Sequence, residues 1–175
     1  MSGKVKIQIV ERAEEFCNDP KLASQFDHLG DCSAKAQHLS ESISSVALFS
    51  HQVKQIRKCK IYIARIQSES VGFLRIGIKH LYLLNSKEKF VEREALSLLD
   101  FYVKESFQRH RIGLRLFHSM LELEHVESPE QLAYDRPSPK LIAFLKKHYD
   151  IDDHKVQPNN FVIFPTFFQL CSNQT

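Results

Sequence analysis

Hydrophobic residues follow two different periods in the middle of the chain, and each period predicts a different element. Residues 95–103, A-L-S-L-L-D-F-Y-V, are almost continuously apolar and contain one carboxylate, Asp100. A run of this length is typical of a strand that is buried on both faces. After Gly113, the apolar positions recur with helical spacing at Leu116, Phe117, Met120 and Leu121. We therefore predict a buried strand, a short basic loop that ends in Gly113, and an amphipathic helix.

The segments before this strand predict helices followed by antiparallel strands. Gly72 and Gly77 in the second long strand indicate bulges or a close approach of another backbone. The expected helices are Leu22–Leu39, interrupted by Gly30, and Ser40–Val53, which follows a serine cap. The expected strands are Lys4–Val10 at an edge, Lys60–Ile66, Val71–Leu84 and Phe90–Val103, with turns at 67–70 and 85–89.

The segments after the central helix predict a strand, a helix and a final strand region. Gln131–Asp135 is the expected strand, and Asn160–Leu170 is the final strand region, broken at Pro165. Ser138 and Pro139 suit the N-cap and first position of a helix that ends at Tyr149. Its buried face is expected to comprise Leu141, Phe144, Leu145 and His148. The order of elements predicts an α+β fold with a mixed, mainly antiparallel sheet flanked by helices.

Composition narrows the class of protein but does not identify a function. The chain has 175 residues, of which 43% are hydrophobic, and this fits a single domain over 1–175. A net charge of +3 is too small to indicate nucleic acid or membrane binding. The four scattered cysteines form no C-x-x-C pair and the nine histidines show no paired ligand spacing, so no metal is expected. Without a long apolar run or a signal peptide, we expect a soluble intracellular protein.

The basic loop before the central helix is a candidate anion site. The first backbone N–H groups of a helix have no partner within it and carry the positive end of its dipole. A diphosphate can accept these hydrogen bonds, and Arg109 and Arg111 add positive charge at the same place. The alternative is a solvated basic turn, since many loops with an arginine precede helices.

A short loop motif and four longer strings in this sequence carry a resemblance to known families. Residues 108–113, Q-R-H-R-I-G, resemble the Q/R-x-x-G-x-G/A pyrophosphate loop of GNAT-type acetyltransferases. The strings L-D-F-Y-V-K-E-S-F-Q-R-H, A-Y-D-R-P-S-P-K-L, N-N-F-V-I-F and, upstream, S-A-K-A-Q-H-L-S resemble the catalytic domain of α-tubulin N-acetyltransferases. They occur in the family's order between about 29 and 168. The resemblance implies a GNAT fold, in which two neighbouring central strands splay apart.

The resemblance implies that acetyl-CoA is the co-substrate, held by the basic loop and the elements on either side of it. Ser138 and Lys147 are the polar contacts expected from the later helix. The full set of implied cofactor-binding residues is Phe101, Tyr102, Val103, Gln108, Arg109, His110, Arg111, Ile112, Gly113, Leu114, Ser138 and Lys147.

Acetyl transfer to lysine requires a group that removes a proton from the amine, because free lysine has a pKa near ~10.4. Asp135 ends a short apolar strand and matches the catalytic aspartate of the family. From the residues alone, Asp135 could instead cap the following helix or pair with Arg136. Gln37 matches a glutamine that the family needs for activity, and its alternative is a polar residue on a helix surface.

Two positions depart from the family's pattern. Ser97 stands where the family has a cysteine that is implicated in catalysis, and a hydroxyl is far less acidic than a thiol, whose pKa is about 8.5. We therefore predict that Asp135 acts alone as the base, at a reduced rate, with Ser97 orienting a water or the amine; the alternative is a small core residue. Arg111 replaces a loop glycine, so it either strains the loop or turns its guanidinium onto a phosphate.

The resemblance also implies the partner and the place of action. It implies direct transfer, in a ternary complex, to a lysine of α-tubulin in microtubules, by a monomer in the cytoplasm and cytoskeleton, including the microtubules of cilia or axonemes. Two alternatives stay open: a catalytically impaired relative that binds microtubules, and a GNAT enzyme that acts on another amine.

Overall fold

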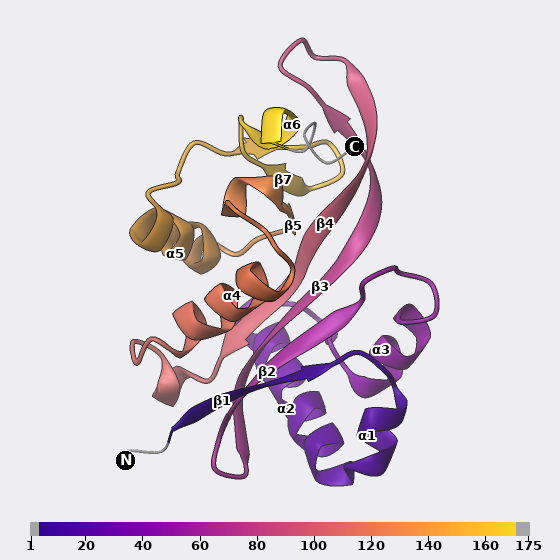
Figure 1. Ribbon diagram of the computed structural model, residues 1–175, viewed down its shortest axis with the longest axis vertical. Helices are drawn as coiled ribbons and strands as arrows, with labels where there is room; N and C mark the ends of the chain where they lie inside the picture. The colour runs from indigo at the N-terminus through magenta and orange to yellow at the C-terminus, as the bar shows by residue number, and fades with distance from the viewer. Residues whose placement is uncertain (1–3, 171–175) are drawn as a thin grey trace.

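A computed structural model describes residues 4–170, which fold around one seven-stranded sheet in the order β1-β2-β3-β4-β5-β7-β6 (Figure 1). All neighbouring strands are antiparallel except β4 and β5, which are parallel, so the predicted mixed and mainly antiparallel sheet is confirmed. The strands are β1 Val5–Val10, β2 Lys60–Ile66, β3 Glu69–Leu84, β4 Phe90–Val103, β5 Ala133–Asp135, β6 Lys155–Val156 and β7 Phe161–Ile163.

Helices cover both faces of the sheet. The alternation along β2 shows how: Tyr62 points into the core beneath α4 and α5, whereas Ile61 and Ile63 point into the core beneath α1, α2 and α3. Short 3-10 turns occupy Glu105–Phe107 and Pro129–Gln131. The helices are α1 Glu14–Asn18, α2 Pro20–Ala36, α3 Val46–Gln52, α4 Ile112–Leu123, α5 Pro139–Tyr149 and α6 Phe167–Leu170.

The sheet opens between β4 and β5. In the β3–β4 ladder, Asp100 pairs with Arg75 and Leu98 pairs with Ile76, so Leu99 is an extra residue that forms a bulge. The parallel ladder from β4 to β5 consists of the pairs at Ser97 and Leu98. Within residues 4–170, no strand pairs with the β5-facing side of β4 beyond Leu98. We call residues 99–103 on this side the open edge of β4, and it agrees with the splayed strands that the resemblance implies.

Several local predictions are confirmed by the structure. Ser138 caps α5, since its hydroxyl accepts a hydrogen bond from the Leu141 amide at 3.2 Å. Gly72 lies close to another backbone, because a Cβ atom there would come within 2.8 Å of the Tyr102 carbonyl oxygen. The edge position of β1 is also confirmed.

The region between α2 and α3 differs from the prediction. Helix α3 begins at Val46 behind the cap Ser45, not after Ser40. Helix α2 runs through Gly30 without interruption and ends at Ala36. A Cβ atom on Gly30 would lie 1.7 Å from the Ser44 carbonyl oxygen. The glycine therefore admits the loop of residues 37–45 against α2, and this packing holds the loop out of helical geometry.

Three smaller predictions were wrong at their ends. The β2–β3 turn is shorter than residues 67–70, because β3 already begins at Glu69. Only Phe161–Ile163 of the expected final strand region is a strand, and α6 follows Pro165. His148 is exposed, although its ring packs against Phe144 with centroids 4.8 Å apart.

Candidate active site

Asp135 ends β5, beside the open edge of β4. Its side chain is 20% exposed, and its Oδ1 atom forms an ion pair with Arg136 Nε at 3.1 Å. The α5 cap is Ser138, so Asp135 does not cap that helix. Of the two alternatives considered for Asp135, pairing with Arg136 is therefore observed. The Arg136 side chain is 64% exposed, so the ion pair lies at the surface and the Asp135 carboxylate is within reach of solvent.

Ser97 and Asp135 project from the same face of the sheet. Ser97 pairs with Ala133 in the parallel ladder, and Asp135 follows Ala133 by two residues on the same strand. Because side chains alternate along a strand, all three lie on the face that α2 and α3 cover. Ser97 is fully buried, and its hydroxyl donates to the Ala95 carbonyl oxygen at 3.0 Å. Its proton is thus engaged by the backbone.

Gln37 is the C-cap of helix α2 and turns its side chain toward the same face. Its Nε2 atom donates to Asp100 Oδ1 at 3.1 Å and to Ser33 Oγ at 2.9 Å. The residue is half-buried, so it is not the polar surface residue of the alternative interpretation.

Asp100 and Arg75 are buried charged residues that sequence reasoning did not place in the site. Each is 4% exposed, and they pair across β3 and β4. Burial lowers the pKa of Arg75, while the negative charges of Asp100 and Asp135 act in the opposite direction. Their signal in the sequence was a single charge within an apolar run, Arg75 in residues 71–78 and Asp100 in residues 95–103, which marks a buried polar group but does not identify its partners.

The loop before α4 adopts a left-handed backbone at two arginines. Arg109 has φ 64° and Arg111 has φ 61°, so Arg111 takes the conformation that favours glycine. Arg111 is the N-cap of α4, and its side chain makes no capping hydrogen bond. Gln108 Nε2 donates to the Val103 carbonyl oxygen at 2.8 Å and fixes the loop to the end of β4. The first N–H groups of α4 therefore lack a side-chain cap, as an anion site requires.

Gly113 lets α4 begin close against β4. A Cβ atom there would lie 3.3 Å from the Phe101 ring. That ring packs in turn against Phe144 of α5, with centroids 5.4 Å apart. Phe101 thus joins both helices at the open edge of β4. Ile112 is buried beneath the start of α4, whereas Leu114 is half-buried.

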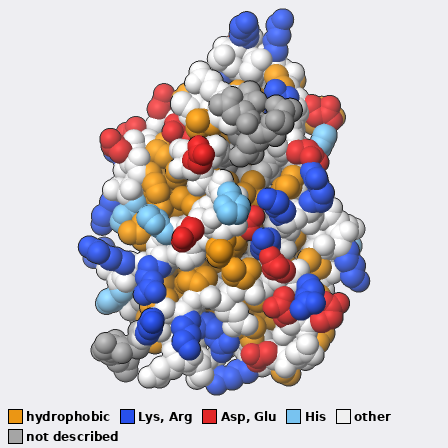
Figure 2. Space-filling view, in the orientation of Figure 1, with side chains coloured by type: hydrophobic (Ala, Val, Ile, Leu, Met, Phe, Trp, Pro, Cys, Tyr) orange, Lys and Arg blue, Asp and Glu red, His pale blue; other side chains and the backbone are white. Residues whose placement is uncertain are grey.

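Positive charge gathers where α4 begins and α5 ends. Arg109, His110, Arg111 and Lys147 are exposed. Burial lowers the pKa of His148, and the charge of Lys147, with smaller effects of His118 and Arg111, lowers it further. Figure 2 shows Lys and Arg side chains along the left and lower left of this face, the side on which α4 begins in Figure 1.

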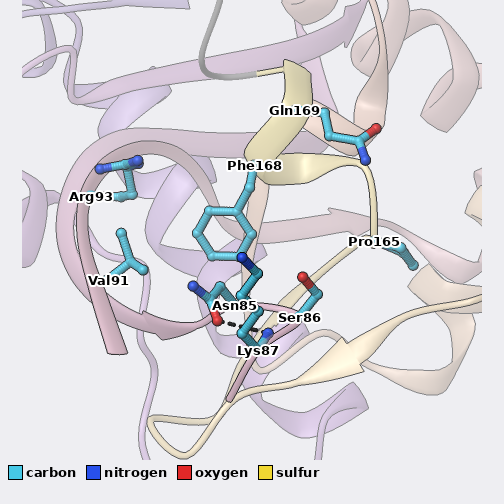
Figure 3. A pocket seen from close by; sticks show the side chains of 8 residues that line it. All are labelled: Asn85, Ser86, Lys87, Val91, Arg93, Pro165, Phe168 and Gln169. Carbon is cyan, nitrogen blue, oxygen red and sulfur yellow. Dashed lines mark hydrogen bonds between the residues drawn. The ribbon is translucent and has the colours of Figure 1, made fainter. Parts of the chain in front are cut away.

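Two hollows lie on the surface of the described residues, one beside the predicted site residues and one away from them. One, of about 410 Å³, separates the end of α2 from the start of α5, and Tyr102 and Lys140 line it with Cys32, Lys35, Ala36, His38 and Glu105. The other, of about 480 Å³, lies beneath the β3–β4 hairpin beside α6 (Figure 3). None of the predicted site residues lines the second hollow, which is formed by Asn85, Ser86, Lys87, Val91, Arg93, Pro165, Phe168 and Gln169.

Within residues 4–170, no group of three or more His, Cys, Asp or Glu side chains is arranged to hold a metal ion. No helix in that part of the chain is long and apolar enough to cross a membrane.

Solved structures with the same fold define the class of protein. The xEco2 acetyltransferase domain superposes with a TM-score of 0.57 at 13% identity, over 94% of this chain and 92% of that chain. The aminoglycoside N-acetyltransferase AAC(6')-Iy, solved in complex with CoA, superposes with a TM-score of 0.51 at 14% identity, over 86% of this chain and 88% of that chain. Both are acetyltransferases by name, and at these identities the superpositions show that this chain shares their fold.

The family is narrower than the fold. Residues 2–175 match the family model described as "GNAT acetyltransferase, Mec-17", and the chain belongs to that family. It is 40% identical to the α-tubulin N-acetyltransferase of Phytophthora infestans, over 94% of this chain and 98% of that protein. It is 42% identical to α-tubulin N-acetyltransferase 1 of Danio rerio, over 86% of this chain but only 50% of that protein. The chain thus spans about half of the zebrafish relative.

Proposed function

We propose that this chain transfers an acetyl group from acetyl-CoA to a lysine side chain of α-tubulin in microtubules. The relatives at about 40% identity carry that activity in their names. One observation in the structure carries the proposal most directly. The open edge of β4 lies between the uncapped start of α4 and Asp135, so an anion site and a carboxylate lie on either side of one gap in the sheet.

The residues around the start of α4 fit the diphosphate of acetyl-CoA. The unpartnered N–H groups at Ile112, Gly113 and Leu114 suit phosphate oxygens, and Arg109 and Arg111 supply positive charge. The open edge of β4 offers backbone groups to an extended chain. Phe101 lies at this edge and shapes it. When bound, acetyl-CoA supplies the activated acyl group; the protein supplies the charge and the backbone donors.

Asp135 is the residue that we assign to deprotonation of the lysine amine. A positioned base contributes roughly 10²- to 10⁴-fold to such a transfer. Ser97 lies on the same face, but its hydroxyl proton is directed to Ala95. This hydrogen bond supports the prediction that Asp135 acts without a second proton carrier. Gln37, at the end of α2, is the third residue that we assign to catalysis.

The partner and location follow from the same proposal. The chain acts as a monomer on microtubules of the cytoskeleton, including those of cilia or axonemes. Two features favour a catalytically impaired relative as the second candidate: Ser97 replaces the family's cysteine, and Arg111 holds a left-handed backbone where the family has glycine.

Acetyl-CoA binding by calorimetry, followed by acetylation of polymerised tubulin in the same preparation, tests the proposal. Binding with acetylation supports the enzyme. Binding of acetyl-CoA without acetylation points to Ser97 or to another amine substrate, and free lysine peptides and polyamines then serve as comparison substrates. A preparation that binds microtubules but not acetyl-CoA would establish the impaired relative instead.

A further inference from the structure

Asp100 is a buried carboxylate that is held mainly by uncharged donors. Its Oδ1 atom accepts from Ser33 Oγ at 2.9 Å, from Gln37 Nε2 at 3.1 Å and from the Phe101 amide at 2.9 Å. Its Oδ2 atom accepts from Ser44 Oγ at 2.6 Å. In all four of these hydrogen bonds the partner is the donor and the Asp100 carboxylate is the acceptor. A buried charge needs such donors, because an unpaired one is costly.

This carboxylate determines which way the Gln37 amide faces. A carboxylate without a proton can only accept, so the amide nitrogen must face Asp100. The two hydrogens of Nε2 then go to Asp100 Oδ1 and Ser33 Oγ. A reversed amide would place its oxygen against Asp100 and against a hydroxyl that already donates to Asp100. The atom left for another molecule is therefore the Gln37 carbonyl oxygen, a hydrogen-bond acceptor.

The end of α2 that carries Gln37 lies beside the open edge of β4, because its neighbours share a hollow with Tyr102. Its neighbours Ala36 and His38 line the 410 Å³ hollow that faces Lys140 at the start of α5. Asp135 precedes α5 by four residues. Gln37 and Asp135 thus stand on the two elements that border the open edge of β4. An acceptor oxygen there suits an amine or ammonium N–H.

We propose that Asp100 is a positioning residue for acetyl transfer: it holds the nitrogen of Gln37 so that the carbonyl oxygen accepts a hydrogen bond from the lysine amine. This assignment deepens the proposed function and rests on it. Asp100 itself does not touch substrate. Its effect on the reaction passes through the orientation of Gln37, and this dependence separates it from a residue that only stabilises the fold.

The other oxygen of Asp100 provides a matched control. Ser44 belongs to the loop of residues 37–45, which is also fastened by Arg75 Nη2, a donor to the Ile43 carbonyl oxygen at 2.8 Å. Ser44→Ala removes a bond to the same buried carboxylate but leaves the Gln37 contact in place. We expect it to lower the melting temperature while kcat on polymerised tubulin stays within about twofold of wild type.

A charge swap at Gln37 and Asp100 tests the assignment at pH 8.5. Gln37→Glu places two carboxylates in contact, so we expect kcat to fall at least about 50-fold, with a smaller change in KM. Asp100→Asn alone should lower kcat less than about fivefold, because its amide can still accept from Gln37 and donate to Ser44. The double variant restores a donor–acceptor pair and should recover kcat to within about fivefold of Asp100→Asn. A double variant no better than Gln37→Glu would overturn the assignment.

Two controls separate this inference from the proposed function. Acetyl-CoA affinity, measured by calorimetry, should be unchanged in all four variants, since none contacts the start of α4. A wild-type protein that binds acetyl-CoA but leaves tubulin unmodified would count against the proposed substrate. The orientation of Gln37 is then tested without substrate: its side-chain amide protons, assigned by their loss in Gln37→Ala, should exchange more slowly than those of exposed glutamines. Exchange at the rate of exposed glutamines would refute the orientation and with it the proposal.

Discussion

Asp100 and Glu124 are both buried carboxylates, but they lie on opposite faces of the sheet and have different partners. Glu124, at the end of α4, accepts from Tyr62 at 2.7 Å and pairs with Lys60 at 2.8 Å and Lys58 at 3.7 Å. Asp100 instead accepts from two serines, an amide side chain and a backbone amide. The Arg75 guanidinium, although opposite Asp100 in the ladder, donates to Gln52 and to the Ile43 carbonyl oxygen.

This difference distinguishes a stabilising cluster from an orienting one. The ammonium groups of Lys58 and Lys60 pair with Glu124. This cluster fastens the end of α4 to β2, away from the open edge of β4. The N–H groups of an amide are fixed in its plane, whereas a lysine ammonium offers three donors that rotate. The Asp100 cluster therefore sets how groups on α2 and the loop 37–45 face, and it does so beside the proposed site.

The largest effect expected on the Asp100 face is chemical. Asp135→Asn keeps the shape of the side chain but removes the base, so kcat on polymerised tubulin should fall at least about 100-fold. Its free energy of unfolding should change by less than about 0.5 kcal/mol, since its ion pair with Arg136 is exposed. Steady-state acetylation and urea unfolding of the same preparation measure both. If the free energy of unfolding falls by as much as the stabilisation of the transition state, Asp135 would be a structural residue rather than the base.

The opposite result is expected on the other face. Glu124→Ala leaves the Tyr62 hydroxyl and the Lys60 ammonium without their buried partner, so the free energy of unfolding should fall by about 3 kcal/mol. Acetyl transfer by the folded fraction should stay within about twofold of wild type. Urea unfolding measures the change in the free energy of unfolding, and initial rates at 20 °C measure acetyl transfer. If the rate falls more than tenfold although the variant is fully folded, the Glu124 cluster would have to contribute to the active site.

A substitution at Ser97 tests whether the rate of acetyl transfer is limited by the acidity of the group at this position. Ser97→Cys introduces, at a fully buried position, the thiol that the resemblance implies there, and kcat should rise by about tenfold if a second proton carrier helps Asp135. The rise should disappear when Asp135 is already replaced by asparagine. An unchanged rate in Ser97→Cys would show that the base alone sets the rate in this protein.

Glu124 should contribute to the pH dependence of stability. Burial alone would raise the pKa of Glu124, but the hydrogen bonds from Lys60 and Tyr62 lower it below its usual 4.5. A carboxyl group with a lowered folded-state pKa contributes stability above its unfolded pKa and loses that contribution as pH falls through the folded value. Urea unfolding between pH 6 and pH 3 should therefore show a flatter decline for Glu124→Gln than for wild type. Parallel declines would exclude this group as the source.

The smallest effect is expected at the start of α4. Arg111→Gly removes a left-handed arginine, which relieves about 1 kcal/mol of backbone strain, while the freer unfolded chain offsets about as much. Stability should therefore change by less than about 0.5 kcal/mol. Acetyl-CoA affinity should weaken about threefold, with a weaker salt dependence, because an exposed positive charge is lost. Tighter binding in the glycine variant would mean that the arginine backbone obstructs the phosphate.

The sequence predicted those parts of the molecule that depend on local pattern. The buried strand that ends at Val103, the helix capped by Ser138 and the turn of residues 85–89 each follow from a few adjacent residues. The family followed from four motifs in order, and the match to residues 2–175 confirms it. The placement of Asp135 at the end of β5 is also as expected.

The parts that failed depend on contacts between distant segments. Asp100 draws its side-chain donors from 67, 63 and 56 residues away, and no periodicity connects such positions. The same contacts keep residues 37–45 out of the helix that was predicted to begin at Ser40. Gly30 looked like a helix interruption, although its role is to leave room for the Ser44 carbonyl oxygen. A helical pattern could not show this, since the neighbour comes from another element.

The extra residue in β4 has a consequence for the shape of the whole site. Bulges bend and twist a strand, and the parallel pairing of β4 with β5 stops at Leu98, immediately before the extra Leu99. If Leu99 were deleted, Asp100 would still stand opposite Arg75 and every later side chain would keep its present side. Only the direction of the strand would change. A deletion of Leu99 would therefore test whether the extra residue, rather than side-chain chemistry, keeps β4 and β5 apart beyond Leu98.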